Sequence, residues 1–104
     1  MSEIINLSEN IISKKDREKI ESFGGHTVSH GRATRWHWQK IENGDEVFEL
    51  FSGGAVEVMT VCISRSRKAD SFYAHDKKGN MVSSGELEHV MAGLEQYFIE
   101  LHGE

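Results

Sequence analysis

The sequence contains no proline, a single cysteine and no long hydrophobic run, and each absence excludes something. Without proline, the turns must be built by Gly, Asn and Asp. The lone Cys62 excludes an internal disulfide, and a single thiol in an apolar stretch is typical of a core residue in a reducing compartment. No window approaches the ~20 apolar residues that cross a bilayer. We therefore expect a soluble, cytoplasmic protein without a membrane segment.

Positive charge is also scarce. The chain has 17 Asp and Glu residues against 12 Lys and Arg, which gives a net charge of −5. An acidic chain has little general affinity for nucleic acids or membrane surfaces. The charges alternate in blocks, with segments 25–41 and 58–80 basic and segments 42–57 and 81–104 acidic. Such blocks can pair neighbouring strands, or pair two copies of the chain.

The length of 104 residues predicts a single domain, 1–104, because a chain of this size accommodates one core. Ser13 is a typical helix N-cap and predicts a helix over 14–23, which Gly24-Gly25 would end. The preceding residues, 1–12, form an apolar arm whose structure the pattern leaves open.

Alternating apolar and β-branched residues then predict a series of strands. They cover residues 26–41, 47–52, 55–64, 71–76 and, as a short last strand, 81–82. Asn43-Gly44 and Gly53-Gly54 have the composition of two-residue hairpin turns. Strands joined by such short turns form an antiparallel meander.

The C-terminal segment shows the strongest helical pattern in the chain. Ser83 and Glu86 have the spacing of a capping box, and apolar residues follow at helical intervals. These residues are Leu87, Val90, Met91, Leu94, Phe98 and Leu101. The predicted fold class is therefore α+β. It consists of an antiparallel β-meander of four to five strands, a short N-terminal helix, and a C-terminal amphipathic helix packed on the sheet.

The two hairpin turns also predict which side chains share a face of the sheet. Two-residue turns would place Trp36 opposite Phe51, and Phe51 opposite Val56. One face would then carry Trp36, Trp38, Val47, Phe51, Val56, Val58 and Cys62, and the other would carry Ile41, Phe48, Leu50, Met59, Val61 and Ile63. Either the helices and the arm cover both apolar faces, or one face meets a partner. A bulged turn of odd length would change this pairing.

These features favour a small non-catalytic protein-interaction module, either a homodimer or a binder of another protein. Its partner-binding residues would be Trp36, Trp38, Phe51, Val56 and Val58, because aromatic side chains anchor interfaces. The pattern assigns no catalytic residue. No histidine pair has ligand spacing on its predicted element, so we expect neither metal nor cofactor.

Two alternatives stay open. The first is a small ligand-binding or enzymatic domain with a pocket near Arg35, His37 and Gln39. The second is binding of an anion or a nucleic acid through basic loops at one end of the sheet. These loops carry Arg65, Arg67 and Lys68 in the first and Lys77 and Lys78 in the second.

Overall fold

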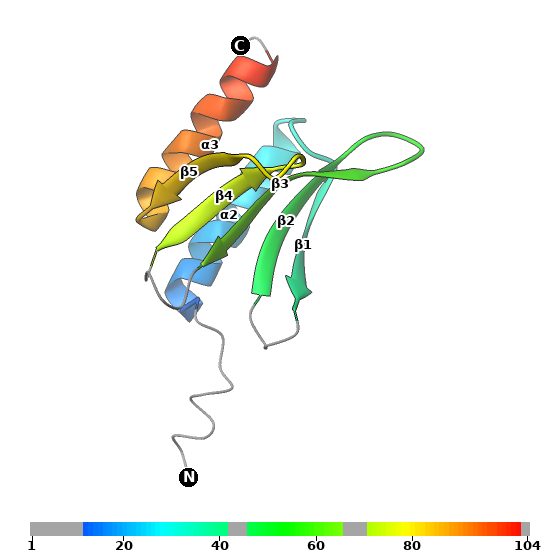
Figure 1. Ribbon diagram of the computed structural model, residues 1–104. Helices are drawn as coiled ribbons and strands as arrows, with labels where there is room; N and C mark the ends of the chain where they lie inside the picture. The colour runs from blue at the N-terminus through cyan, green and yellow to red at the C-terminus, as the bar shows by residue number, and fades with distance from the viewer. Residues whose placement is uncertain (1–11, 42–45, 66–70, 103–104) are drawn as a thin grey trace.

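The computed structural model describes residues 12–41, 46–65 and 71–102, which form two helices and one antiparallel sheet (Figure 1). In chain order the elements are α2 (Lys14–Ser29), β1 (Arg35–Lys40), β2 (Glu46–Ser52), β3 (Val58–Arg65), β4 (Phe72–Asp76), β5 (Met81–Gly85) and α3 (Leu87–His102). The sheet has five strands in the order β1-β2-β3-β4-β5. An α+β class with an antiparallel meander and two helices is thus confirmed.

Helix α2 begins as predicted and ends later. The Ser13 hydroxyl accepts a hydrogen bond from the Asp16 amide at 3.1 Å, which satisfies a free N–H of the first turn. The helix then continues through both glycines to Ser29, so the predicted end at residue 23 and the strand start at residue 26 are wrong. His30 is the C-cap, and the next residue, Gly31, has a φ of 76°, a left-handed conformation that favours glycine after a helix.

Gly24 lies inside α2 because the helix approaches the sheet closely there. A Cβ at this position would overlap the Phe48 ring and lie 3.1 Å from Cγ of Trp36. Gly24 is itself buried. The glycine therefore permits helix–sheet contact, a role that a sequence pattern does not distinguish from helix termination.

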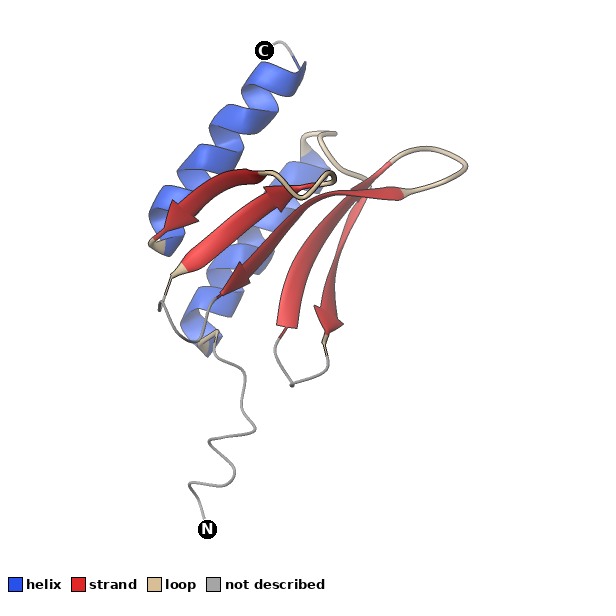
Figure 2. Cartoon of the chain, viewed as in Figure 1, coloured by secondary structure: helices blue, strands red, loops and turns tan. Residues whose placement is uncertain are grey.

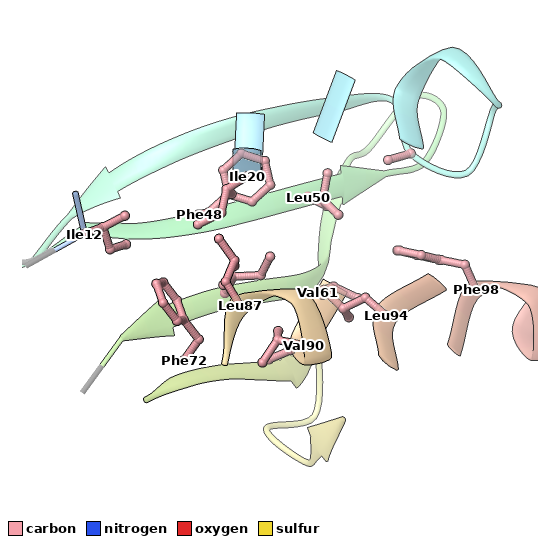
Figure 3. Packing of buried hydrophobic residues seen from close by; sticks show 13 residues of the cluster. Ile12, Ile20, Phe48, Leu50, Val61, Phe72, Leu87, Val90, Leu94 and Phe98 are labelled. Atoms are coloured by element: carbon pink, nitrogen blue, oxygen red, sulfur yellow. The ribbon is translucent and has the colours of Figure 1, made fainter. Parts of the chain in front are cut away.

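Both helices lie on the same side of the sheet, as Figure 2 shows. Side chains from this side and from the helices form one apolar cluster, part of which is labelled in Figure 3. The fully buried large members are Phe48, Phe98, Ile20, Leu50, Ile63, Leu94, Val61 and Val90. We call this side of the sheet the covered face.

The pairing of β1 with β2 differs by one residue from the prediction. Trp36 pairs with Leu50, and Trp38 pairs with Phe48. This places both indoles on the covered face, with ring centroids 5.6 and 5.1 Å from that of Phe48. The predicted Asn43-Gly44 turn lies outside the described residues. The observed register is what an odd-length connection gives, because a one-residue shift moves each side chain to the other face.

Strands β2 and β3 are also joined differently. Residues 53–57 connect them, so the predicted two-residue turn at Gly53-Gly54 is wrong. The register shifts between Leu50 and Phe51 and leaves Thr60 as an extra residue on β3. The Thr60 hydroxyl donates a 3.2 Å hydrogen bond to the Leu50 carbonyl at this bulge. The bulge places Met59 on the same face as Phe51, away from the helices, so the prediction that Met59 shares a face with Phe48 is wrong.

Helix α3 buries most of its predicted stripe. Leu87, Val90, Leu94 and Phe98 are buried, whereas Leu101 is 59% exposed near the end of the helix. The predicted capping box is wrong, because Ser83 belongs to β5 and its side chain lies against Gly93 of the helix. Over the described residues, neither helix has the length and apolar character needed to cross a membrane.

Candidate interaction surface

The face of the sheet turned away from the helices is the main candidate surface, and we call it the open face. Among the described residues, neither helix crosses it (Figure 2). Cross-strand pairing and strand alternation place the following side chains on it: Arg35, His37, Gln39, Val47, Glu49, Phe51, Met59, Cys62, Ser64, Tyr73, His75, Met81 and Ser84. The face therefore mixes aromatic, aliphatic and ionisable groups.

A row of ionisable side chains crosses the middle of the open face. His37 pairs with Glu49, Glu49 with Cys62, and Cys62 with His75. Neighbours in such a row lie about 5 Å apart, because that is the spacing of strands in a sheet. Glu49, Cys62 and His75 are half-buried. The row therefore places a carboxylate and an imidazole on either side of a thiol at the centre of the sheet.

The thiol of Cys62 has a raised pKa, whereas a nucleophilic thiol needs a lowered one. Burial raises the pKa of Cys62, and the nearby carboxylates of Glu49 and Asp76 raise it further. A catalytic cysteine instead needs a lowered pKa, because the thiolate is the reactive form. The surroundings of Cys62 thus favour packing over chemistry.

A second row lies one step along the strands. Gln39 pairs with Val47, and Tyr73 pairs with both Ser64 and Ser84. The alignment of β2 with β3 continues from Phe48 and Ile63 to place Val47 beside Ser64. The Tyr73 ring stacks against His75 of the first row, with centroids 6.4 Å apart. Gln39 and Ser84 are the polar ends of this row. Val47 and Tyr73 lie on either side of Ser64, which is at its centre.

The other end of the open face is aromatic and ion-paired. Phe51 pairs with Met59, and the Arg35 guanidinium lies 4.2 Å from the centre of the Phe51 ring. Arg35 Nε also donates a 2.7 Å hydrogen bond to Glu57, which accepts another from the Thr34 hydroxyl. These two hydrogen bonds lower the pKa of Glu57, because they stabilise the carboxylate. The guanidinium of Arg35 is therefore held between the Glu57 carboxylate and the Phe51 ring.

The structure separates the five predicted partner-binding residues, so the expectation that they share one face is wrong. Trp36 and Trp38 lie on the covered face, whereas Phe51 lies on the open face. Trp38 is held there by α2, because its indole N–H donates to Glu21 at 2.7 Å. Val56 and Val58 are 75% and 48% exposed around the β2–β3 connection.

Arg65 and the pair Lys77 and Lys78 lie at opposite ends of the sheet, contrary to the prediction that they share one end. Arg65 ends β3 and pairs with Phe72 at the start of β4. Lys77 and Lys78 instead follow Asp76 at the far end of that strand. The two ends of β4 lie at opposite ends of the sheet, so Arg65 does not form one basic cluster with Lys77 and Lys78. Arg67 and Lys68 lie outside the described residues.

The alternative pocket residues all lie on β1, along one edge of the open face. Arg35 is ion-paired with Glu57. The Gln39 amide lies within 2.9 Å of the Glu49 carboxylate, with its nitrogen oriented to donate. His37 is exposed, and its ring lies 6.4 Å from that of Phe51. A ligand pocket at these residues stays a prediction.

His26 lies in the last turn of α2 and His30 is the C-cap of that helix, so neither lies on the strand predicted over residues 26–41. His26 and His30 are exposed, and their ring centroids are 4.0 Å apart. His30 Nδ1 lies 3.0 Å from the His26 carbonyl, so this nitrogen carries the proton of the hydrogen bond. Among the side chains that the structure describes, no three His, Cys, Asp or Glu residues gather into a metal site.

An open groove of about 690 Å³ runs between the two helices on the other side of the molecule. Phe23 and Met91 line it together with charged residues, including Lys19 and Glu95. Lys19 also bridges the helices through a 2.7 Å ion pair with Glu88. The groove is a second candidate docking surface. The Lys19 side chain that lines it is already paired with Glu88 of the facing helix.

Sequence inspection missed Tyr73 and His75, which lie near the centre of the open face. The available signal was the alternation in β4, where Phe72 and Ala74 are buried while Tyr73 and His75 are not. Glu49 follows the same alternation in β2, between buried Phe48 and Leu50. These side chains show which face is open only once the strand register is known.

No protein-family model, curated protein or solved structure matches the chain. The family of the protein is therefore not defined by similarity. Its function is inferred below from the composition and geometry of the open face.

Proposed function

We propose that the protein is a small non-catalytic module that binds another protein chain through the open face of its sheet. The observation that carries the proposal is the asymmetry of the sheet. The covered face packs on a cluster of buried side chains, whereas the open face carries Phe51, Met59 and Tyr73 with neither described helix across it. A sheet face that carries aromatic and Met side chains and has no described helix across it is a candidate protein interaction site, because these residue types are enriched at interfaces.

The composition of the open face supports a protein partner. Interfaces combine aromatic and Met side chains with a smaller number of paired polar groups. Phe51, Met59 and Tyr73 supply the first class, and Glu49 and His75 supply the second. The proposed binding surface is therefore the open face, and not the covered face on which Trp36 and Trp38 lie.

The same surface offers little for catalysis. The pKa of Cys62 is raised by burial, and Arg35 and Gln39 are each engaged with a neighbouring carboxylate. A half-buried thiol on the binding face also favours a reducing compartment, so we propose a cytoplasmic location.

Site-specific photocrosslinking tests the proposal. A benzophenone amino acid replaces Tyr73 on the open face in one variant, and Ala92 on the exposed surface of α3 in a matched control. We expect irradiation in cells to give a defined protein adduct from position 73 and none from position 92. Adducts from position 92 alone, or from neither position, would contradict binding through the open face.

A further inference from the structure

We infer that the partner on the open face is a second copy of this chain, related by a two-fold axis that runs along β3 between two facing sheets. This inference rests on the proposed function and names the occupant of that surface. It is carried by the side chains of β2, β3 and β4 in the two rows, whose arrangement is complementary to itself under this rotation.

The strand order sets the geometry. Strand β3 is central, with two strands on each side (Figure 1). A rotation about an axis along β3 keeps every row at its own height and exchanges β2 with β4, and β1 with β5. Face-to-face sheets pack about 10 Å apart with strand directions within about 30°, so side chains of matching rows meet.

The middle row becomes charge-complementary under this rotation. Glu49 on β2 and His75 on β4 flank Cys62 on β3. Glu49 of one copy then lies over His75 of the second copy, and the reciprocal pair forms on the other side of the axis. Cys62 lies over its own equivalent, so the centre of the interface is occupied by two small half-buried thiols.

The second row matches in the same way. Val47 on β2 lies over Tyr73 on β4, so aliphatic and aromatic surfaces meet. Ser64 lies over its own equivalent on the axis, and Gln39 at one edge lies over Ser84 at the opposite edge. In this second row, apolar groups therefore face apolar groups and polar groups face polar groups. In the middle row the complementary pair is Glu49 with His75, whereas at its edges His37 lies over Met81.

The alternative two-fold orientation lacks this complementarity. An axis perpendicular to the strands, along the middle row, leaves each strand facing its own equivalent. It would place Glu49 over Glu49 and His75 over His75. Juxtaposed carboxylates oppose association, so the axis along β3 is the favoured one.

A charge swap across the interface tests both the occupant and the axis. Glu49→Lys places an ammonium group against His75 of the second copy, and His75→Glu places two carboxylates together. Light scattering after size-exclusion chromatography, over a range of protein concentrations, measures dimerisation of each variant. We expect a dimer for the wild type, and a dissociation constant at least about tenfold higher for each single variant.

Mixing the two single variants provides the decisive rescue. In a mixed dimer, the lysine introduced at position 49 of one copy lies over the glutamate introduced at position 75 of the other. The native His75 then lies over the native Glu49, so the mixture is expected to dimerise about as well as the wild type. The E49K/H75E double variant is expected to recover for the same reason. Glu100→Lys and His89→Glu make the same charge changes on exposed positions of α3, and neither should change the dissociation constant.

The outcomes separate this inference from the proposed function. A wild-type chain that stays monomeric overturns the inference, as does a dimer that the single substitutions leave intact or that mixing does not restore. If position 73 nevertheless crosslinks to a different protein, the proposed function stands and only the occupant is wrong. If position 73 crosslinks to no protein, both are wrong.

Discussion

Gly24 and Gly25 are adjacent in sequence, but their surroundings in α2 are different. A Cβ at Gly24 would overlap the buried Phe48 ring, whereas a Cβ at Gly25 has no other atom within 4 Å. Two glycines in a row are usually a helix stop signal. Here the first permits close packing and the second is a neutral, exposed position.

This difference predicts opposite effects of the same substitution. Gly24→Ala is expected to lower the free energy of unfolding by about 1–3 kcal/mol, because it overpacks the contact with Phe48 and Trp36. Gly25→Ala should raise it by up to about 1 kcal/mol, because Ala has the higher helix propensity. Urea unfolding of both variants measures the two values, and equal effects would show that α2 does not lie close to β2.

Individual residues on the sheet were predictable only in part. The alternation of β1 indicates that both tryptophans share a face and that Arg35 and His37 lie on the other, which the pairing confirms. Which of the two faces that is depends on the β1–β2 register. Register depends on the length of a connection, and Asn43-Gly44 looks the same in sequence whether the turn has two residues or three.

At the level of elements, α2 is joined to β2 by a charge pair at the border of the core. The Arg17 guanidinium bonds to Glu46, whose side chain is 5% exposed, and also lies 4.2 Å from the centre of the Trp38 ring. A buried carboxylate without its cation is costly, because the interior solvates charge poorly.

Removing that cation is therefore predicted to destabilise the fold. Arg17→Met keeps the aliphatic stem over Trp38 but leaves Glu46 unpaired, and it should lower the free energy of unfolding by about 1–3 kcal/mol. The R17M/E46Q double variant removes both charges and should recover at least half of that loss. If the double variant is no more stable than R17M, the pair does not hold α2 against β2.

The elements themselves were predicted better than their ends. The pattern of α3 and the N-cap of α2 identify both helices, and five strands appear near their predicted positions. The observed ends of the elements differ from the predicted ones where a tertiary contact overrides a local sequence signal. Gly24 packs instead of ending α2, and Ser83 pairs in β5 and contacts Gly93 instead of capping α3.

At the scale of the whole molecule, both helices pack on one face of the sheet, and no described helix crosses the other face. The sequence predicts apolar residues on both faces of the sheet, but the structure shows a strongly apolar covered face and a mixed open face. The mixture arises because the register gathers Trp36, Phe48, Leu50 and Val61 on one side. The open face retains isolated apolar side chains among charged ones, which is the pattern that self-complementary pairing can use.

The measurement that tests this account most directly uses Cys62, the one cysteine in the chain. The two-fold axis places Cys62 of one copy opposite Cys62 of the second. We predict that a short bismaleimide converts the folded protein into a covalent dimer on a denaturing gel. A C62S/A92C variant, with the thiol moved to the exposed surface of α3, should stay monomeric under the same treatment. A covalent dimer from A92C but not from Cys62, or from neither, would contradict the proposed interface.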